Sequence, residues 1–393
     1  MAGCLDGIRI IDLTANVSGP FGTAMLGDMG ADVIKVEPPG LGDLSRYFGP
    51  ARGGIAAGFA VINRNKRGIA LDLQAPDGRD VLLKLAQSAD VVLQNFRPGV
   101  VDRLGVGYDG CRAVRPDIIY VSISGYGDSG PRAGDPVYDP VIQAAAGFMM
   151  VQSEPGSDAP VPVRNIICDK LTSMSVVQAV TGALFARERG RGGQHVKISM
   201  LDTGLAFLWP DAMSNLTYIG ETPPWPEIGN TYNLPRTKDG YVIGFAITDA
   251  QFQGLCRALG RPDLAADARF TNIMARVANL EALSQIITEE IAKFTTDEIV
   301  ENFSREEVPG SKINSRSDLL SDTQIAHNEL IVETDHPQAG RMRYTRPPII
   351  FEGTPSSIRR HAPQLGGNTD EVLTEAGFGK DEIARLREKG VAG

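Results

Sequence analysis

Short apolar runs alternate with stretches of helical periodicity through the first half of the chain. The runs have the length of buried strands and lie at 8–13, 31–37, 69–73, 91–95, 117–124 and 194–199. Between them, apolar residues three and four positions apart predict helices, for example at 76–89 and 136–150. This alternation is typical of a doubly wound α/β sheet of Rossmann type, which binds ligands at the carboxyl ends of its strands.

The composition of the chain changes after residue 220. Residues 222–226 have the sequence TPPWP, which indicates a linker. Beyond it we expect one strand, at 241–247, and helices at 249–259, 277–293, 296–303 and 369–376. We therefore predict a large Rossmann-like domain from residues 1–220 and 316–393, built from both chain ends. Residues 225–315 form a smaller inserted domain.

The stretch 164–187 combines an apolar lead-in, a single acid and a long helical pattern. Ile166 to Cys168 precede Asp169, and apolar residues then recur at helical spacing from Leu171 to Leu184. Two interpretations are open. Asp169 can be the N-cap that accepts a hydrogen bond from the first turn of the helix. It can also be a nucleophilic carboxylate held at the positive end of the helix.

Charge and composition narrow the class of protein. The 393 residues are 42% hydrophobic and carry a formal net charge of −9, which argues against nucleic acid as a partner. Asp12 interrupts the first apolar run, so we expect no signal peptide, and no segment has the length of a membrane span. The four cysteines and four histidines show no metal-ligand or disulfide spacing. We expect a cytoplasmic enzyme whose chemistry needs no metal.

A glycine-rich loop, 125–130, matches the dinucleotide pattern G-x-G-x-x-G and follows a predicted strand. A dinucleotide site also needs a helix that begins within the motif, whereas residues 131–136 (PRAGDP) predict a loop. We favour an active-site loop, and an NAD-dependent oxidoreductase is the alternative.

Two groups of residues suggest a phosphate-bearing ligand. Arg64, Lys66 and Arg67 are either a solvated charge cluster or a phosphate clamp. Arg97 follows another predicted strand beside Phe96, and an aromatic ring next to cations would suit a nucleotide. Tyr138 and Asp139 precede an apolar stretch. They either begin a helix or form a pocket wall that faces Asp169.

Together these segments resemble the class III CoA-transferase family, which includes formyl-CoA transferase, carnitine CoA-transferase and the α-methylacyl-CoA racemases. The matching segments extend over nearly the whole chain and occur in the family's order. They are DLT with GP at 12–20, GADVIKVE at 30–37, NKR at 65–67, NFRPG with LG at 95–105, SGYG with GP at 124–131, the Asp169 segment, TKDGY at 237–241 and PQLG at 363–366.

The resemblance implies a Rossmann-like large domain, an inserted α+β domain and an interlaced homodimer. It implies CoA or acyl-CoA as a substrate, with no tightly bound cofactor. The candidate CoA contacts are Val17, Ser18, Lys66, Asn95, Phe96, Arg97 and Arg103. Asp169 aligns with the family's nucleophile, which passes CoA from an acyl-CoA to a free carboxylic acid through an aspartyl-CoA thioester. Candidates for the substrate pocket are Tyr138, Asp139, Gly229 and Asn230. We expect the oxyanion donors in the first turn after Asp169 and in the Gly229–Asn230 loop.

Two departures from the family pattern bear on the reaction. The racemases have a histidine at the position of Tyr138, which is a poor base for removing an α-proton. The sequence therefore favours a transferase, with a racemase or epimerase and a non-catalytic acyl-CoA binding protein as alternatives. Residues 227–232 also lack the glycine run of formyl-CoA transferase, which argues against oxalate-type substrates.

Overall fold

The computed structural model describes residues 2–154, 156–221, 223, 225 and 232–393. The chain forms two compact units, which we call the large unit (Met1–Leu208 with Glu329–Gly393) and the small unit (Trp209–Asn328). Within the predicted linker, residues 222, 224 and 226 lie outside the described residues.

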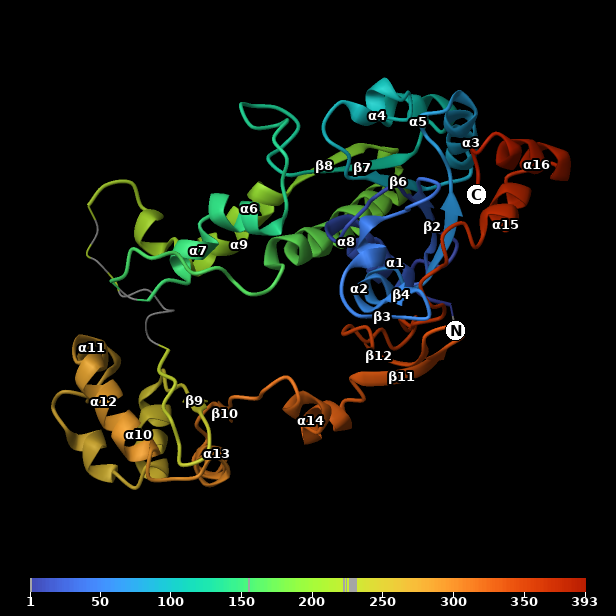
Figure 1. Ribbon diagram of the computed structural model, residues 1–393. Coiled ribbons are helices and arrows are strands. Elements are labelled where there is room, and N and C mark those ends of the chain that lie inside the picture. Colours follow the sequence, from blue (N-terminus) through green and yellow to red (C-terminus); the bar gives the residue numbers. More distant parts are fainter. Residues whose placement is uncertain (1, 155, 222, 224, 226–231) are drawn as a thin grey trace. The chain divides into compact units, whose positions relative to one another are not determined.

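Six parallel strands form the central sheet of the large unit (Figure 1). They are β1 (Arg9–Asp12), β2 (Asp32–Glu37), β5 (Lys66–Ala70), β6 (Val91–Gln94), β7 (Ile119–Ser124) and β8 (His195–Ser199). Their spatial order is β5-β2-β1-β6-β7-β8, so in chain order the strands run 3-2-1-4-5-6. This is the strand order of the Rossmann fold. The predicted α/β class is confirmed. Five of the six predicted apolar runs contain the corresponding strand, whereas β5 overlaps the run at 69–73 only at its end.

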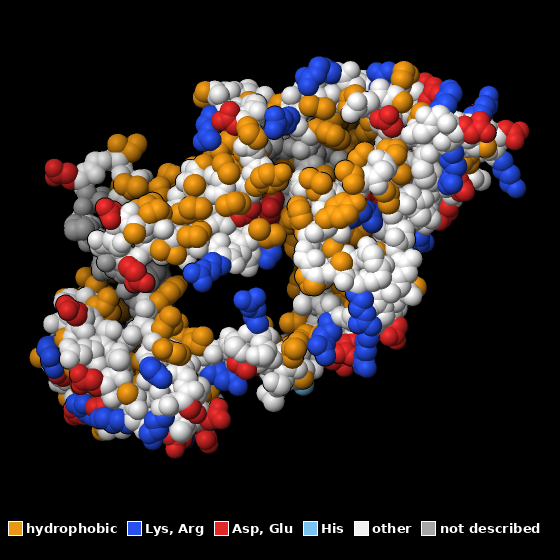
Figure 2. Space-filling view, viewed as in Figure 1, with side chains coloured by type: hydrophobic (Ala, Val, Ile, Leu, Met, Phe, Trp, Pro, Cys, Tyr) orange, Lys and Arg blue, Asp and Glu red, His pale blue; other side chains and the backbone are white. Residues whose placement is uncertain are grey.

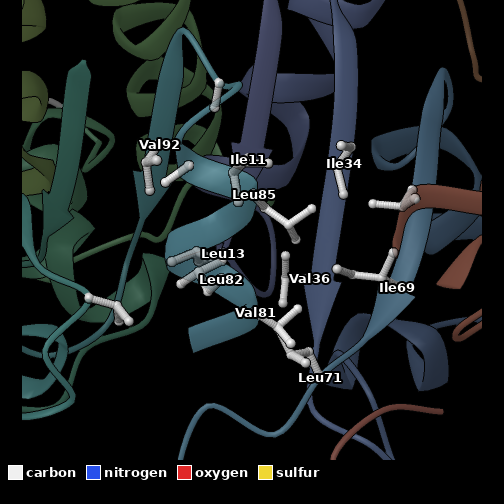
Figure 3. Packing of buried hydrophobic residues seen from close by; sticks show 14 of the residues in the cluster. Ile11, Leu13, Ile34, Val36, Ile69, Leu71, Val81, Leu82, Leu85 and Val92 are labelled. Carbon is white, nitrogen blue, oxygen red and sulfur yellow. The ribbon is translucent and has the colours of Figure 1, made fainter. Parts of the chain in front are cut away.

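Helices cover both faces of this sheet because alternate residues of each strand point to opposite sides. On one face, Ile11, Ile34 and Val92 pack against α3 (Pro76–Ala86) (Figure 3). The C-terminal helices α15 (Thr369–Glu375) and α16 (Lys380–Glu388) add to the same core. Each large apolar side chain buried in this way stabilises the fold by about 1.5–3 kcal/mol.

The other face carries α1 (Ser18–Asp28), against β1 and β2, and α8 (Ile167–Ala186), against β7 and β8. These two helices also pack closely against each other. At Gly22 of α1 an added Cβ would lie only 2.8 Å from Val176 Cγ1 of α8. The missing side chain lets α1 and α8 pack closely, which matters for the site below.

The large unit also contains further helices and two small antiparallel sheets. The helices are α2 (Ala57–Ile62), α4 (Val100–Arg103), α5 (Tyr108–Val114), α6 (Asp139–Ala145), α7 (Phe148–Val151) and α9 (Met200–Ala212), which continues into the small unit. Two antiparallel pairs complete it: β3 (Ala51–Arg52) with β4 (Ile55–Ala56), and β11 (Ile331–His336) with β12 (Gly340–Thr345).

The small unit combines helices with a two-stranded antiparallel sheet. The strands are β9 (Val242–Gly244) and β10 (Gly310–Lys312), and the helices are α10 (Asp249–Ala258), α11 (Ile273–Ala278), α12 (Leu280–Ile291), α13 (Thr296–Arg305) and α14 (Thr323–His327). Thr248 and Thr295 begin α10 and α13 with capping boxes, in which side chains satisfy the free backbone N–H groups. Its separate apolar core includes Phe252, Phe270 and Phe303.

Several predicted element limits were wrong for identifiable reasons. The predicted helix at 136–150 is two helices, α6 and α7, because Gly147 adopts φ +92° between them. The helix predicted at 277–293 is divided between α11 and α12. Strand β5 begins at Lys66, within a charged segment that the apolar pattern did not indicate.

Candidate active site

A cavity of about 260 Å³ opens at the carboxyl ends of the sheet strands. Its lining comes from the segments that follow β1, β6, β7 and β8 and from the start of α8. The strand order reverses between β1 and β6, and doubly wound sheets bind ligands at such a point. Six predicted site residues meet there: Ser18, Asn95, Phe96, Arg97, Tyr138 and Asp169.

Asp169 lies in the first turn of α8 but does not cap it. The helix begins at Ile167, its N-cap residue is Ile166, and Ile166 makes no side-chain cap hydrogen bond. The interpretation of Asp169 as an N-cap was therefore wrong, because the helix starts three residues earlier than an N-cap at Asp169 requires. As the third residue of the helix, Asp169 directs its carboxyl group toward the cavity that it lines.

Asp139 takes over the role of the cap from another element. Its Oδ2 accepts a hydrogen bond of 3.0 Å from the backbone N–H of Asp169. Its Oδ1 accepts a hydrogen bond of 2.5 Å from Gln143 Nε2, one turn further along α6. Asp139 is 2% exposed, so its carboxylate lies beneath the cavity and contacts the nucleophile candidate through the backbone.

The electrostatics of Asp169 are those of a buried acid beside a second acid. Burial raises the pKa of Asp169 from 3.8 to about 7, and the negative charge of Asp139 adds to the increase. The hydroxyl and backbone N–H of Ser18 act in the opposite direction, because they favour the ionised carboxylate. Near neutral pH a substantial fraction of Asp169 is ionised. Its carboxylate is poorly solvated, which makes it a better nucleophile than a carboxylate in water.

Ser18 reaches Asp169 because α1 and α8 pack closely. Ser18 is the first residue of α1 and is buried. Ser173, one turn after Asp169 on α8, donates its hydroxyl to the carbonyl oxygen of Ser18 at 2.8 Å and to that of Asp169 at 2.9 Å. This hydroxyl joins the amino ends of the two helices, so the donors of Ser18 stay beside the carboxyl group of Asp169.

The neighbouring thiol does not compete with this carboxylate. Cys168 is fully buried, and burial together with the charges of Asp139 and Asp169 raises the pKa of its thiol to about 12. The thiol therefore stays protonated at neutral pH, and a protonated thiol is a poor nucleophile.

The loop after β6 is fixed by hydrogen bonds to the segment after β1 and to the last residue of β6. Asn95 donates from Nδ2 to the carbonyl oxygen of Ala15 at 2.8 Å and accepts at Oδ1 from the N–H of Ala15 at 2.9 Å. Gln94 Oε1 accepts a hydrogen bond from the N–H of Phe96 at 2.7 Å. The ring of Phe96 and the exposed Arg97 border the cavity on this loop. The guanidinium of Arg97 makes no ion pair with any residue that the structure describes.

The segment 14–16 is fixed by charged side chains from other elements. Lys35 Nζ donates to the carbonyl oxygen of Thr14 at 2.9 Å, and Asp43 Oδ1 accepts from the N–H of Asn16 at 3.1 Å. Lys35 and Asp43 also form a buried ion pair at 2.8 Å. These contacts hold Asn16, which lines the cavity, in a left-handed backbone conformation with φ +66°.

Lys66 was wrongly assigned as a phosphate contact. Its ammonium group is buried and donates to Asp12 Oδ2, the carbonyl oxygen of Pro20 and Asn63 Oδ1, at 2.8 to 2.9 Å. An ammonium group has three donors, so none remains for a ligand. Lys66 therefore supports the fold beneath α1 and is withdrawn from the candidate CoA contacts.

The two arginines of the same cluster are also structural. Arg64 forms a buried pair with Asp28 at 2.6 Å. Arg67 pairs with Asp32, Glu371 and Glu375, and so attaches the C-terminal helix α15 to the edge of the sheet. Both earlier interpretations of this cluster, a solvated face and a phosphate clamp, were wrong.

The other predicted site residues lie at or near the cavity. Val17 is the N-cap of α1, between two residues of the lining, and Arg103 is exposed at the end of α4, outside the lining. Tyr138 lines the cavity as the N-cap of α6 and is 63% exposed. Gly229 and Asn230, predicted for the pocket and for oxyanion binding, lie outside the described residues.

Three N–H groups in the first turn of α8, where we expected oxyanion donors, already have acceptors within the protein. The N–H groups of Ile167 and Lys170 donate to the carbonyl oxygens of Asn165 and Ile166, and that of Asp169 donates to Asp139. These donors are already used within the protein.

The glycine-rich loop has no dinucleotide-binding helix. Gly127 and Gly130 adopt φ of +102° and +92°, and α6 begins only at Asp139. Ser124 and Gly125 line the cavity at the start of this loop, as do residues 135–138 at its end. The loop therefore begins and ends at the cavity, and its role as an active-site loop stays a prediction.

Sequence analysis missed several residues of the site. Gln143 was not singled out, although it lies four positions after Asp139 on the same helical pattern. Ser173 has the same spacing from Asp169. This i, i+4 spacing could have indicated that each pair shares one helix face. Met200 and Asn16, which line the cavity, gave no recognisable signal in the sequence.

Within the described residues, no helix is long and apolar enough to cross a membrane. In the same part of the chain, no group of three His, Cys, Asp or Glu side chains is arranged to hold a metal ion.

Comparison with known proteins gives concordant matches across the chain. The profile of "CoA-transferase family III" matches residues 5–369. The chain is 34% identical to succinate–glutarate CoA-transferase of Agrobacterium fabrum, over 94% of this chain and 95% of that protein. It is 33% identical to succinyl-CoA:mesaconate CoA-transferase of Haloarcula hispanica, over 96% and 97% of the two chains.

Solved structures resemble the whole chain as well. A CAIB/BAIF family protein from Brucella suis superposes with a TM-score of 0.82 at 32% identity, covering 96% of this chain and 100% of that chain. The hypothetical protein Rv3272 from Mycobacterium tuberculosis gives a TM-score of 0.83 at 29% identity, covering 94% and 99%.

Proposed function

The chain belongs to CoA-transferase family III, and we propose from this membership and the geometry of the cavity that it transfers CoA through a covalent thioester on Asp169. The family resemblance predicted from the sequence is thereby confirmed. The protein is an acyl-CoA:carboxylate CoA-transferase. The observation that carries the proposal is the poorly solvated carboxyl group of Asp169, which lines the cavity in the first turn of α8.

The proposed reaction proceeds through four acyl transfers. The carboxylate of Asp169 attacks the thioester carbonyl of the donor, which forms a mixed anhydride and releases the CoA thiolate. The thiolate attacks the carbonyl carbon of Asp169, which forms the aspartyl-CoA thioester and releases the donor acid. The acceptor carboxylate attacks this thioester and again releases the thiolate. Finally the thiolate attacks the acceptor's acyl carbon and regenerates Asp169. Covalent intermediates divide one difficult exchange into easier steps.

The other acids near the cavity fit this role less well. Asp139 is buried beneath the cavity, and both of its oxygens accept hydrogen bonds from protein groups. Asp135 lines the cavity, but it is exposed and forms an ion pair with Arg132 at 3.0 Å. Asp169 combines access to the cavity with a poorly solvated carboxyl group whose pKa is raised, which supports its assignment as the nucleophile.

Ser18 is the proposed source of oxyanion stabilisation. The oxygen of the Asp169 carboxyl group becomes the carbonyl oxygen of the anhydride and of the thioester. The hydroxyl and N–H of Ser18 interact with this carboxyl group in the free protein, and they would stabilise the charge that develops on its oxygen during each attack.

The loops beside the cavity are the proposed CoA site. Val17 and Ser18 lie after β1, and Asn95, Phe96 and Arg97 lie after β6, with Arg103 further along the chain. We assign Arg97 to a CoA phosphate, because it is a cation at the cavity with no partner among the described residues. The predicted domains, 1–220 with 316–393 and 225–315, then assign CoA binding to the large domain.

Short dicarboxylic acids are the proposed substrates. The two relatives named above are CoA-transferases for succinate and glutarate and for mesaconate. Each of these acids has a second carboxylate beyond the one that carries CoA. We therefore propose succinyl-CoA as a donor and a dicarboxylic acid with four or five carbons in its main chain as the acceptor.

A homodimer is also part of the proposal. Helix α8 is apolar on all sides, which is typical of a helix covered all round, yet Met174 and Phe185 are 59% and 68% exposed. Apolar side chains also gather on the surface of α6, α7 and α9 (Figure 2). A second copy of the chain, interlaced with the first as in the family, would cover them. Sedimentation of the wild type as a dimer, with Phe185→Asp shifted toward the monomer, is the expected result.

The test of the nucleophile is the Asp169→Ala variant with succinyl-CoA and a panel of dicarboxylic acids. Transfer should fall to background, and mass spectrometry should detect a CoA adduct on Asp169 of the wild type. Asp202→Asn is the matched control, because Asp202 is the third residue of α9 and is exposed. It should retain full activity. Retained transfer by Asp169→Ala would refute the mechanism.

A deuterium-exchange assay tests the alternative function, a racemase. No residue that lines the cavity is a histidine. The family resemblance aligns Tyr138, which lines it, with the base of the racemases. Incubation of the wild type with a 2-methylacyl-CoA in deuterated water, without an acceptor acid, should give no deuterium at the α-carbon.

A further inference from the structure

Gln143 connects three segments that meet beneath Asp169. It lies on α6 and is 2% exposed. Its Nε2 is 2.5 Å from Asp139 Oδ1, 3.0 Å from the carbonyl oxygen of Asn165 and 3.2 Å from that of Val163. Its Oε1 accepts a hydrogen bond of 3.1 Å from the N–H of Val163.

These contacts allow one orientation of the Gln143 amide. The NH2 group faces three acceptors, and the carbonyl oxygen faces a donor. Rotation of the amide by 180° would direct its oxygen toward the Asp139 carboxylate and two carbonyl oxygens. The side chain is buried, so water cannot replace the lost hydrogen bonds, and the rotated state would be costly.

The fixed amide also fixes the carboxylate of Asp139. With Oδ1 bound to Gln143, Oδ2 of Asp139 points to the N–H of Asp169 at 3.0 Å. The same amide holds Val163 and Asn165, which lie shortly before α8 in the chain. The first turn of α8 is therefore held by the segment 163–165 that precedes it and by the carboxylate of Asp139 that caps it. Both of these groups are hydrogen-bonded to Gln143.

We propose that Gln143 is a positioning residue for the nucleophile Asp169: its amide orients Asp139 and secures the segment 163–165, and so holds the first turn of α8 at the cavity. This inference rests on the proposed role of Asp169. Gln143 itself does not line the cavity, so it acts on the reaction through its neighbours.

The inference requires an amide on a side chain of this length. Methionine has a similar length but no N–H group, so Asp139 would lose its donor and could turn away from Asp169. Glutamate has the same shape but cannot donate when ionised, and it would add a negative charge near Asp139 and Asp169. The groups that face the Asp169 carboxyl group are Asp139 from α6, Ser18 from α1 and the thiol of Cys168.

The experiment compares Gln143→Met and Gln143→Glu with the wild type in steady-state kinetics from pH 5.5 to 9. For Gln143→Met we expect kcat to fall about 10- to 100-fold, since misplacement of a catalytic group by an ångström has effects of this size. The KM for the acyl-CoA should change less than about two-fold, because the CoA loops keep their own hydrogen bonds.

The acid limb of the plot of kcat against pH distinguishes two effects of the substitutions. One is misplacement of Asp139 and Asp169, and the other is a general loss of stability of the fold. In Gln143→Met the limb should move to lower pH, because Asp139 no longer holds its charge beside Asp169. In Gln143→Glu it should move to higher pH, because another negative charge is added. Gln74→Met is the control: Gln74 is exposed, its side chain makes no hydrogen bond that the structure records, and all parameters should match the wild type.

A second measurement does not depend on turnover. Protein labelled with ¹³C at the aspartate carboxyl groups is titrated by NMR, and the Asp169 signal is assigned by its loss in Asp169→Asn. Its pKa should be lower in Gln143→Met than in the wild type and higher in Gln143→Glu. Unchanged kcat in both variants, or an Asp169 titration that moves in neither, would overturn the inference. An inactive wild type with shifted titrations would instead contradict the proposed function.

Discussion

Replacement of Asp169 by asparagine should make the protein more stable at neutral pH, although it removes activity. The folded chain binds the proton of Asp169 more tightly than the unfolded chain, because the carboxyl group is buried beside Asp139. Its unfolding free energy therefore falls as the pH rises from about 4 to about 7, and this contribution is constant at higher pH. Asparagine has the same shape and carries no charge at any of these pH values.

The size of the effect follows from the raised pKa. The pKa of Asp169 is about 7 in the folded state against an ordinary value of 3.8. Each pKa unit corresponds to about 1.36 kcal/mol, so ionisation of Asp169 lowers the stability of the folded state by at most about 4 kcal/mol at pH 8. Water in the cavity screens part of this cost. We expect Asp169→Asn to raise the unfolding free energy by about 2–4 kcal/mol at pH 8.5, and by about 1 kcal/mol less at pH 6.

The assay is urea-induced unfolding of both proteins at pH 6 and pH 8.5, at the same protein concentration. Asp202→Asn, which removes an exposed carboxylate from the first turn of α9, should show no comparable gain at either pH. A stability gain that is the same at both pH values would refute the reasoning, because it would not arise from ionisation. Destabilisation by Asp169→Asn would show that the carboxylate contributes more to the fold than its burial costs.

Three further substitutions test the assignment of the remaining groups. Lys66→Met leaves the buried Asp12 carboxylate without its ion-pair partner and should lower the unfolding free energy by about 3–5 kcal/mol, while the KM of the folded enzyme for acyl-CoA stays within two-fold. Arg97→Ala removes an exposed cation at the cavity; it should raise this KM about ten-fold and leave the unfolding midpoint unchanged. Gly22→Ala adds a Cβ 2.8 Å from Val176 and should separate α1 from α8, which lowers stability by about 1–3 kcal/mol and reduces kcat. A higher KM in Lys66→Met would restore Lys66 as a ligand contact. An unchanged KM in Arg97→Ala would remove Arg97 from the CoA site. Full activity of Gly22→Ala would disprove the need for close packing of α1 against α8.

The strands of the large unit were predictable because their signal is local. Buried parallel strands are apolar on both faces, so runs such as 31–37 stand out whatever surrounds them. Loops at the carboxyl ends of such strands were expected to form the site, and those after β1, β6 and β7 do line the cavity. The family segments added Asp169, which spacing alone did not distinguish from a cap.

Charged residues were the main source of error, because their partners lie far away in the sequence. Arg67 pairs with Glu371 and Glu375, and Lys66 pairs with Asp12, 54 residues away. No local pattern indicates such pairs. A cationic cluster is normally solvated or binds an anionic ligand, whereas here acids supplied by the fold neutralise it and bury it.

The sequence by itself determined the parallel α/β class, the positions of five of the six strands, the loops of the cavity and the identity of Asp169 as a candidate nucleophile. Only the tertiary structure decided the chemical state of that residue. Burial of Asp169 and the charge of Asp139 thirty residues earlier raise its pKa to about 7, although the donors of Ser18 from another helix lower it. Solvation and charge act through space, so the ionisation of a carboxyl group depends on neighbours that its own sequence segment does not specify.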